Sequence, residues 1–259
     1  MAFLQVQFFS DVLNVASTVN VILPEANQGI GIEASTGQEL PDVLYLLHGY
    51  SDDHSIWMRR TSVERYAAEH NLAVIMPAVY HSFYCNELYG ERYWDYVSTE
   101  LPETMQRFLK ISKDPAKTYV AGLSMGGYGA MRLALTYPER FAAAASFSGA
   151  VDVYRTMRNH DQEGTAKRIL GSSGPEVDPR GTELDLNYLK EKNKSSAHKP
   201  RIYISCGTED FLYHQHQAFV PGLIEAGWDV TRHDEPGAIH EWGFWDQEIK
   251  KFIDFIYDV

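Results

Sequence analysis

Ala121-Gly122-Leu123-Ser124-Met125-Gly126-Gly127 is the stretch of sequence that decides the fold. It follows a short apolar run that ends at residue 121 and precedes a pattern of apolar positions at 128–137 that predicts a helix. A strand, Gly-x-Ser-x-Gly and a helix in this order form a nucleophile elbow. The sharp turn predicts a strained backbone at Ser124, and the two flanking glycines avoid a collision of side chains. The stretch therefore predicts a serine hydroxyl presented above a sheet, beside the N–H groups of a helix N-terminus.

Short apolar runs and helical patterns alternate on both sides of the elbow. We expect strands at 3–9, 12–23, 43–47, 72–76, 118–121, 141–147, 201–207 and 229–233. We expect helices at 61–69, 96–110, 128–137, 212–226 and 244–257, with Pro102 bending the second helix or starting a new turn. This alternation predicts an α/β protein with a mostly parallel central sheet and helices on both faces.

The segment 151–199 interrupts this alternation. It is polar, it contains several glycines and prolines, and it has only short helical patterns such as 165–170. We interpret it as a small, cap-like insertion over the carboxyl ends of the strands. The chain, 1–259, is then predicted to form a single domain around one large core.

Composition limits the classes of partner. The 259 residues carry a formal net charge of −12, which disfavours nucleic acid and anionic membrane surfaces as partners. Two cysteines do not make a disulfide framework, and no apolar run approaches the length of a membrane-spanning helix. The first residues lack the basic and apolar regions of a signal peptide, so the sequence predicts a cytoplasmic protein.

The partners of Ser124 are sought at the carboxyl ends of later strands, where ligands gather in such sheets. Asp210 follows one predicted strand and His240 follows the next. Ser124, Asp210 and His240 have the chain order Ser…Asp…His of α/β-hydrolases. We expect His240 to take the serine proton and return it to the leaving group, and Asp210 to orient the imidazole.

Other acidic and histidine residues are candidates for the same roles. Glu209 adjoins Asp210, and Asp152 also follows a predicted strand, although it stands at the start of the insertion and not after it. His233 lies inside a predicted strand, which favours a structural role. His214 and His216 point to different faces of a helix, so a shared metal ion is not expected. No group of cysteines and histidines has metal-ligand spacing, and the sequence predicts neither a metal nor a cofactor.

The oxyanion of the transition state needs two N–H donors that are already in place. One is the backbone N–H of Met125, directly after the serine. The loop His48-Gly49-Tyr50 follows the first buried strand, and we expect the N–H of Tyr50 to be the second donor. The imidazole of His48 is interpreted as a buried anchor of this loop.

Three separated stretches carry a resemblance to a known family. They are Leu46-Leu47-His48-Gly49-Tyr50-Ser51-Asp52-Asp53-His54-Ser55-Ile56-Trp57, Thr61-Ser62-Val63-Glu64-Arg65 and Ala121-Gly122-Leu123-Ser124-Met125-Gly126-Gly127-Tyr128-Gly129. In order and spacing the chain resembles the tributyrin esterase family, a branch of the esterase D and S-formylglutathione hydrolase group. The resemblance implies an α/β-hydrolase fold, a carboxylesterase acting on short acyl chains, and Tyr50 and Met125 as oxyanion donors.

The sequence thus predicts a serine carboxylesterase that hydrolyses short-chain acyl esters of small molecules through an acyl-enzyme intermediate. A thioesterase of the S-formylglutathione hydrolase type, an acyltransferase and a non-catalytic binding module are the alternatives; a homo-oligomer is left open. We expect six aromatic residues to wall the site and shorten the acyl pocket. They are Tyr50, Trp57, Tyr80, Phe83, Tyr84 and Trp242. An anionic thioester would be repelled by the negative electrostatic potential of this acidic protein unless a basic residue of the insertion reaches the site.

Overall fold

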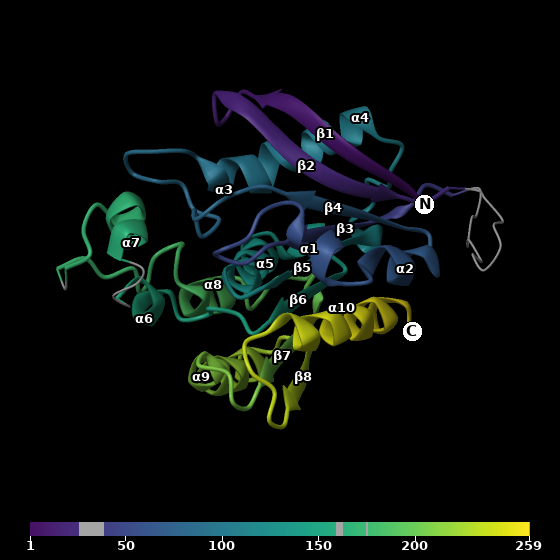
Figure 1. Cartoon of the computed structure of the whole chain (residues 1–259). Coiled ribbons are helices and arrows are strands. Elements are labelled where there is room, and N and C mark those ends of the chain that lie inside the picture. The colour runs from purple at the N-terminus through teal and green to yellow at the C-terminus, as the bar shows by residue number, and fades with distance from the viewer. Residues whose placement is uncertain (26–38, 159–162, 175, 259) are drawn as a thin grey trace.

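The computed structural model describes residues 1–25, 39–158, 163–174 and 176–258, and it is built around one eight-stranded sheet (Figure 1). The predicted loop at 24–41 lies largely outside these residues. The order of the strands across the sheet is β1-β2-β4-β3-β5-β6-β7-β8. The strands are β1 (Ala2–Ser10), β2 (Val15–Leu23), β3 (Asp42–Leu47), β4 (Leu72–Pro77), β5 (Thr118–Leu123), β6 (Ala143–Phe147), β7 (Arg201–Gly207) and β8 (Val230–Glu235).

The register of the sheet explains where ligands can reach it. β1 and β2 form an antiparallel hairpin, and β2 pairs antiparallel with β4. From β4 onward every neighbouring pair is parallel, through β3, β5, β6, β7 and β8. The carboxyl ends of six strands therefore meet at one edge, where the loops after β3, β5, β7 and β8 carry the predicted site residues.

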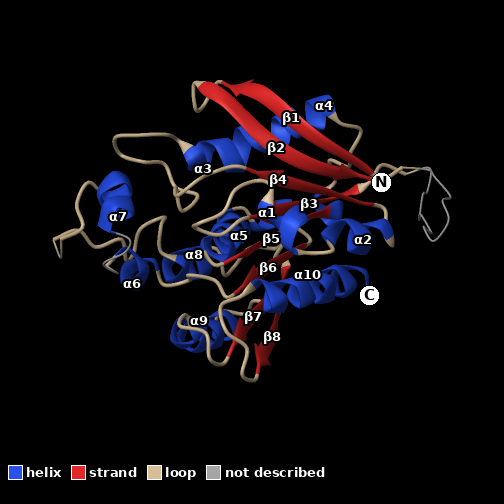
Figure 2. Ribbon diagram, in the orientation of Figure 1, coloured by secondary structure: helices blue, strands red, loops and turns tan. Residues whose placement is uncertain are grey.

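Helices cover both faces of the sheet, as Figure 2 shows. The helices are α1 (Ile56–Arg60), α2 (Val63–Ala68), α3 (Tyr93–Asp95), α4 (Leu101–Phe108), α5 (Met125–Thr136), α6 (Val153–Met157), α7 (Glu163–Leu170), α8 (Leu186–Lys192), α9 (Tyr213–Glu225) and α10 (Trp242–Tyr257). Alternate residues of β3 point to the two faces. Val43, Tyr45 and Leu47 join the core under α4, α5, α8 and α9, while Leu44 and Leu46 join the core under α1, α2 and α10. This architecture confirms the predicted α/β arrangement of a mostly parallel sheet with helices on both faces.

Pro102 lies where a π-helical turn passes into α4. A π-helical turn, Tyr96–Glu100, precedes α4, and Pro102 stands in the first turn of α4. Proline has no N–H to donate to the carbonyl of Ser98, four residues earlier. The guanidinium of Arg140 donates to that carbonyl instead, at 2.6 Å. The predicted helix at 96–110 is therefore observed as one continuous run over residues 96–108 that begins with a π-helical turn, and a side chain from elsewhere donates to the Ser98 carbonyl.

The segment 151–199 has two parts. α6 and α7 lie beyond the end of the sheet, at the left of Figure 1. α8 instead belongs to the main core, because Leu186 and Leu189 on this helix are fully buried. The hydroxyl of Tyr128 on α5 donates to the carbonyl of Leu184 at 2.7 Å and fixes the chain that enters α8. Among the described residues of the insertion, those of α6 and α7 are therefore the ones that lie near the predicted site.

None of the helices in the described ranges combines the length and hydropathy required to span a bilayer.

Candidate active site

Ser124 has the strained backbone that the elbow predicts. Its φ of 52° and ψ of −116° lie in a region that residues with a Cβ rarely adopt. A Cβ at Gly122 would overlap the carbonyl group of Gly126, and a Cβ at Gly126 would overlap the carbonyl oxygens of Leu47 and His48, so both positions require glycine. The serine N–H donates to the carbonyl of Phe147 at 2.9 Å, which holds the strained residue against β6. The side chain is thereby fixed at the start of α5.

His240 and Asp210 form a hydrogen-bonded pair. The Nδ1 of His240 lies 2.8 Å from the Oδ2 of Asp210, and the N–H of Leu212 donates to Oδ1 at 2.8 Å. Burial by itself raises the pKa of the Asp210 carboxyl. The hydrogen bond to His240, the imidazole charge and the N–H of Leu212 act in the opposite direction, and together they hold this pKa below its usual value. Because an ionised carboxylate only accepts hydrogen bonds, Nδ1 carries the imidazole proton. The Nε2 of His240 is then the nitrogen available as a base.

Ser148, which the sequence reasoning missed, lies beside this pair. It directly follows β6, is fully buried and has a φ of 48°. The Nε1–H of Trp245 donates to its Oγ at 3.1 Å, and the Ser148 hydroxyl hydrogen-bonds to Asp210 and contributes to the lowered pKa of that carboxyl. The ring of Trp245 also meets the ring of His240 edge-on, with centroids 4.8 Å apart. The position directly after a predicted strand was the signal that could have identified Ser148.

Side chains hold three consecutive carbonyl groups of the loop after β3. The Nε1–H of Trp57 donates to the carbonyl of Leu47 at 3.1 Å. The hydroxyl of Tyr84 donates to the carbonyl of His48 at 2.9 Å, and the Nδ1 of His48 lies 2.7 Å from the carbonyl of Gly49. The Gly49 carbonyl belongs to the same planar peptide group as the Tyr50 N–H. Because the carbonyls are held, the direction of the Tyr50 N–H is fixed as well.

The His48 imidazole is neutral and has one defined tautomer. The N–H of Val79 donates to its Nε2 at 3.0 Å, so Nδ1 carries the proton and donates to Gly49. The side chain is only 1% exposed. Burial lowers the pKa of His48 to about 4, although the hydrogen bond to Gly49 acts in the opposite direction. These contacts confirm the predicted role of His48 as an anchor of the loop.

The two predicted oxyanion donors lie in fixed surroundings. Met125 is the first residue of α5, so its N–H has no acceptor within the helix. The hydroxyl of Tyr50 lies 2.9 Å from the Oγ1 of Thr165 on α7, and its ring stacks on His81 with centroids 4.4 Å apart. The side chain of Tyr50 thus joins the loop after β3 to the insertion.

A cavity of about 510 Å³ connects these groups. It is lined by Gly49, Tyr50, Ser51, Asp52, Phe83, Leu123, Ser124, Ala150, Arg155, Thr156, Arg158, Phe211, Leu212, His214, Gln215 and His240. Ser124 and His240 therefore open onto the same space. The cavity thus holds a serine and a histidine, the two residue types that the predicted chemistry needs.

The predicted aromatic wall is only partly correct. Tyr50 and Phe83 line the cavity, whereas the rings of Trp57 and Tyr84 are buried and donate to backbone carbonyls. The two remaining rings, Tyr80 and Trp242, do not line it either. The sequence reasoning missed Phe211, which is 64% exposed and has its ring centroid 4.5 Å from that of His240.

Charged side chains meet at the cavity from two sides. Asp52 lies on the loop after β3, and burial raises the pKa of its carboxyl. Arg155 on α6 and Arg158 just beyond it line the cavity from the insertion. The basic residues that an anionic substrate would require are therefore present at the site.

Comparison with known proteins identifies the family. The Esterase family model, described as "Putative esterase", matches residues 10–249. The chain belongs to this esterase family. The esterase is 29% identical to the acetyl esterase of Caldicellulosiruptor saccharolyticus over 268 residues, which cover 100% of this chain and 99% of that protein. The resemblance to the esterase D group that the sequence predicts is thus confirmed.

Two solved structures support the same assignment. The substrate-bound fluorophosphonate-binding serine hydrolase F of Staphylococcus aureus matches the esterase with a TM-score of 0.89 and 35% identity, covering 100% of this chain and 99% of that chain. The S-formylglutathione hydrolase of the same organism matches with a TM-score of 0.85 and 35% identity, covering 98% of both chains. The esterase is a serine hydrolase of the α/β-hydrolase fold that acts on carboxylic esters.

The alternative acids of the esterase lie elsewhere. Glu209 is exposed and does not line the cavity, whereas its neighbour Asp210 is buried against the imidazole. Asp152 caps α6, where its carboxylate accepts from the N–H of Arg155 at 3.0 Å. The geometry therefore favours Asp210 among the three acids.

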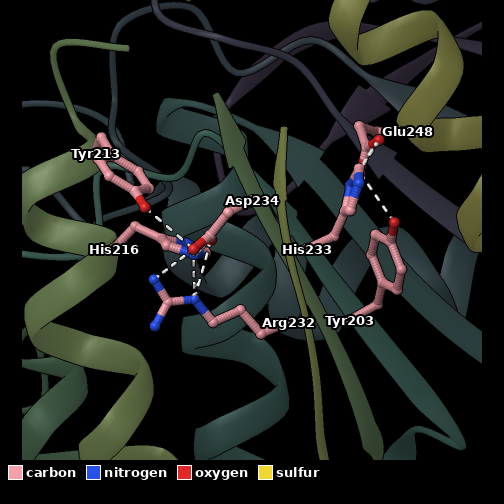
Figure 3. A network of polar contacts seen from close by, with 7 residues as sticks. All are labelled: Tyr203, Tyr213, His216, Arg232, His233, Asp234 and Glu248. Atoms are coloured by element: carbon pink, nitrogen blue, oxygen red, sulfur yellow. Dashed lines mark hydrogen bonds and ion pairs between the residues drawn. The ribbon is translucent and has the colours of Figure 1, made fainter. Parts of the chain in front are cut away.

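The two histidines of α9 point to different places, as their spacing predicts. His214 lines the cavity, whereas His216 is buried and has its Nε2 2.8 Å from Asp234 on β8 (Figure 3). Tyr213 also donates to Asp234, at 3.1 Å. Since α9 follows the loop of Asp210 and β8 precedes the loop of His240, these contacts hold together two elements that flank the acid–histidine pair.

His233 lies on the other face of β8 (Figure 3). Its Nδ1 is 3.2 Å from the carboxylate of Glu248 on α10, which also accepts from the hydroxyl of Tyr203 at 2.9 Å. The ammonium of Lys251 also donates to Glu248 at 2.8 Å, so this fully buried carboxylate has a cationic partner as well. His233 thus has the structural role that its place in a strand predicts.

Proposed function

We propose that this esterase hydrolyses small-molecule esters of short acyl chains through an acyl-enzyme formed on Ser124. One observation carries the proposal: a strained serine and the imidazole of a buried acid–histidine pair open onto the same cavity. The acetyl ester specificity in the name of the Caldicellulosiruptor relative agrees with short acyl groups.

The proposed reaction has two half-reactions. His240 takes the proton of Ser124 through Nε2 as the hydroxyl oxygen attacks the acyl carbon. The oxyanion accepts from the N–H groups of Met125 and Tyr50, and Asp210 stabilises the imidazolium. His240 then returns the proton to the leaving alcohol, and the acyl group remains on the serine. A water molecule, deprotonated by His240, releases the acid and regenerates the hydroxyl.

A thioesterase of the S-formylglutathione hydrolase type is the second candidate. Arg155 and Arg158 at the cavity favour it, because glutathione thioesters are anionic. The same triad would serve, with a thiol in place of the alcohol.

The test is a set of nitrophenyl esters with acyl chains from C2 to C12, measured beside S-formylglutathione. We expect kcat/KM to be highest for acetyl to butyryl esters and to fall steeply by C8. A clearly higher kcat/KM for S-formylglutathione than for every ester would assign the thioesterase function instead.

The role of Ser124 is tested by Ser124→Ala, with Ser196→Ala as the control outside the cavity. We expect the first substitution to lower kcat by about 10⁴-fold or more and the second to leave it unchanged. A fluorophosphonate probe should label wild type and Ser196→Ala, but not Ser124→Ala. Labelling and turnover that survive in Ser124→Ala would contradict the assignment.

A further inference from the structure

A second cavity, of about 100 Å³, lies near the amino ends of the parallel strands. Its lining comes from β3, α4, α5 and the segments that lead into β5 and β6. None of these residues lines the active-site cavity. The candidate catalytic groups follow the carboxyl ends of the strands, so the second cavity lies toward the opposite edge of the sheet.

Part of this lining is apolar. Val97, Leu133 and Phe141 are buried and belong to the core that α4 and α5 share with the sheet. Pro102 of α4 is buried beside them. At about the size of a water molecule for each atom, the cavity has room for roughly three to seven non-hydrogen atoms. A ligand that fits is therefore small and has an apolar part.

Tyr45 on β3 brings an unpartnered hydroxyl to this cavity. Its side chain is only 6% exposed, and among the described residues no group hydrogen-bonds to its hydroxyl. Burial raises the pKa of Tyr45, so the hydroxyl keeps its proton and remains a donor. A buried donor without an acceptor costs free energy, and a ligand that supplies the acceptor recovers it.

Two positive charges line the same cavity. Arg140 donates through one Nη to the Ser98 carbonyl and lies over the ring of Phe141, 5.9 Å from its centroid. Its charge acts against the raised pKa of Tyr45, so the guanidinium lies near that hydroxyl. Within the described ranges, its other N–H groups and the ammonium of Lys113 have no hydrogen-bond or carboxylate partner. None of the described lining residues is acidic, although the whole chain carries a formal charge of −12.

We propose that this cavity binds a short-chain carboxylate, with butyrate as the probe. The carboxylate accepts from the guanidinium of Arg140 and the hydroxyl of Tyr45, and the exposed Lys113 adds a positive charge at the mouth. The alkyl chain contacts Val97 and Leu133. Inorganic phosphate would place polar oxygens against this apolar wall, and a much longer acid would exceed the volume. The inference goes beyond the proposed function, because it concerns a different cavity and needs no turnover.

Methyl NMR distinguishes the two cavities within one sample. The methyl groups of Val97 and Leu133 report on the second cavity, and those of Leu123 report on the active-site cavity. Butyrate is added at constant ionic strength. We expect saturable shifts at Val97 and Leu133 with a Kd of about 1–10 mM, the range expected for so small a ligand. Butyramide, which has the same shape without the charge, and octanoate should leave these resonances unchanged.

Two substitutions test the donors, each beside a matched control. Tyr45→Phe removes one hydroxyl, and Tyr119→Phe does the same on the other face of the sheet. Lys113→Gln removes a charge from the lining, and Lys110→Gln removes an exposed charge that does not line the cavity. We expect the Kd for butyrate to rise about tenfold in Tyr45→Phe and about threefold in Lys113→Gln, and to stay unchanged in both controls.

Thermal unfolding separates ligand binding from a structural role of the hydroxyl. Without ligand, Tyr45→Phe should be at least as stable as wild type, because the hydroxyl has no partner to lose. Butyrate should raise the Tm of wild type more than that of Tyr45→Phe, since a ligand that binds only the folded state stabilises it. A clearly lower Tm of ligand-free Tyr45→Phe would contradict the unpartnered donor on which the inference rests.

Other results would also overturn the inference. Shifts confined to Leu123, or no saturable shift at all, would show that butyrate does not bind in the second cavity. An equal Kd in wild type and Tyr45→Phe would remove the hydroxyl from the site. Tighter binding of inorganic phosphate than of butyrate at Leu133 would replace the carboxylate by another anion. Since none of these measurements uses an ester, a failure of the proposed function is seen separately in the turnover assays.

Discussion

Acidification should destabilise the fold through His48. Burial lowers the pKa of this imidazole to about 4, whereas a histidine in an unfolded chain has a pKa of about 6.5. Protonation therefore favours the unfolded chain. The contribution is fully present above the unfolded pKa and is lost as pH falls toward the folded pKa. Integrating between the pKa values of about 6.5 and about 4, we expect His48 to cost about 2 kcal/mol of unfolding free energy between pH 7 and pH 5.

The assay is reversible urea unfolding of wild type, His48→Gln and His198→Gln at pH 7 and pH 5. Glutamine keeps an acceptor for the Val79 N–H but does not titrate. The loss of unfolding free energy between the two pH values should be about 2 kcal/mol smaller in His48→Gln than in wild type. His198 is exposed, so its substitution should leave the loss unchanged. Comparing losses removes the contributions of other groups, such as the buried His216.

An equal loss in wild type and His48→Gln would refute this reasoning, provided that the m-values agree. A second measurement does not depend on the variant. Histidine ring nitrogen spectra of wild type at pH 5 should show His48 neutral, with the proton on Nδ1. A protonated His48 ring at pH 5 would show that burial does not hold the imidazole neutral.

Three further predictions concern the chemistry. Asp210→Asn should lower kcat for 4-nitrophenyl acetate by about 10⁴-fold, and Glu209→Gln should not; the opposite result would assign the acid to Glu209. Ser148→Ala removes a donor to the Asp210 carboxylate, so kcat should fall about tenfold with little change in KM; an unchanged kcat would show that the hydroxyl does not position the acid. Tyr84→Phe leaves the His48 carbonyl without its donor, so kcat should fall and the unfolding free energy should drop by about 1–3 kcal/mol; normal activity and stability would show that other contacts suffice.

The elbow and the strand order could be predicted from sequence because their signals are local. A parallel strand buried on both faces is a continuous apolar run, and β3 and β5 both have this form. The motif glycines specify the turn at Ser124 without reference to distant residues. Asp210 and His240 needed only one further rule, that ligands gather beyond the carboxyl ends of strands.

Contacts between distant residues could not be predicted in this way. Ser148 and Trp245 are 97 residues apart, and no local pattern joins them. The error in the aromatic wall has a related cause. The rings of Trp57 and Tyr84 carry an N–H and an O–H, and both turn inward because backbone carbonyls of the loop after β3 are there to accept. An aromatic residue in a loop therefore does not by itself predict a pocket wall.

The order of the site elements along the chain has a consequence for synthesis on the ribosome. The strained serine, the loop after β3 and the acid on the loop after β7 all emerge before His240 and the helix that carries Trp245. Domains are made from the N-terminus onward, so a nascent chain that has not reached residue 240 has a serine without a base. Ester turnover is therefore expected only after β8 has joined the sheet and α10 has packed against it.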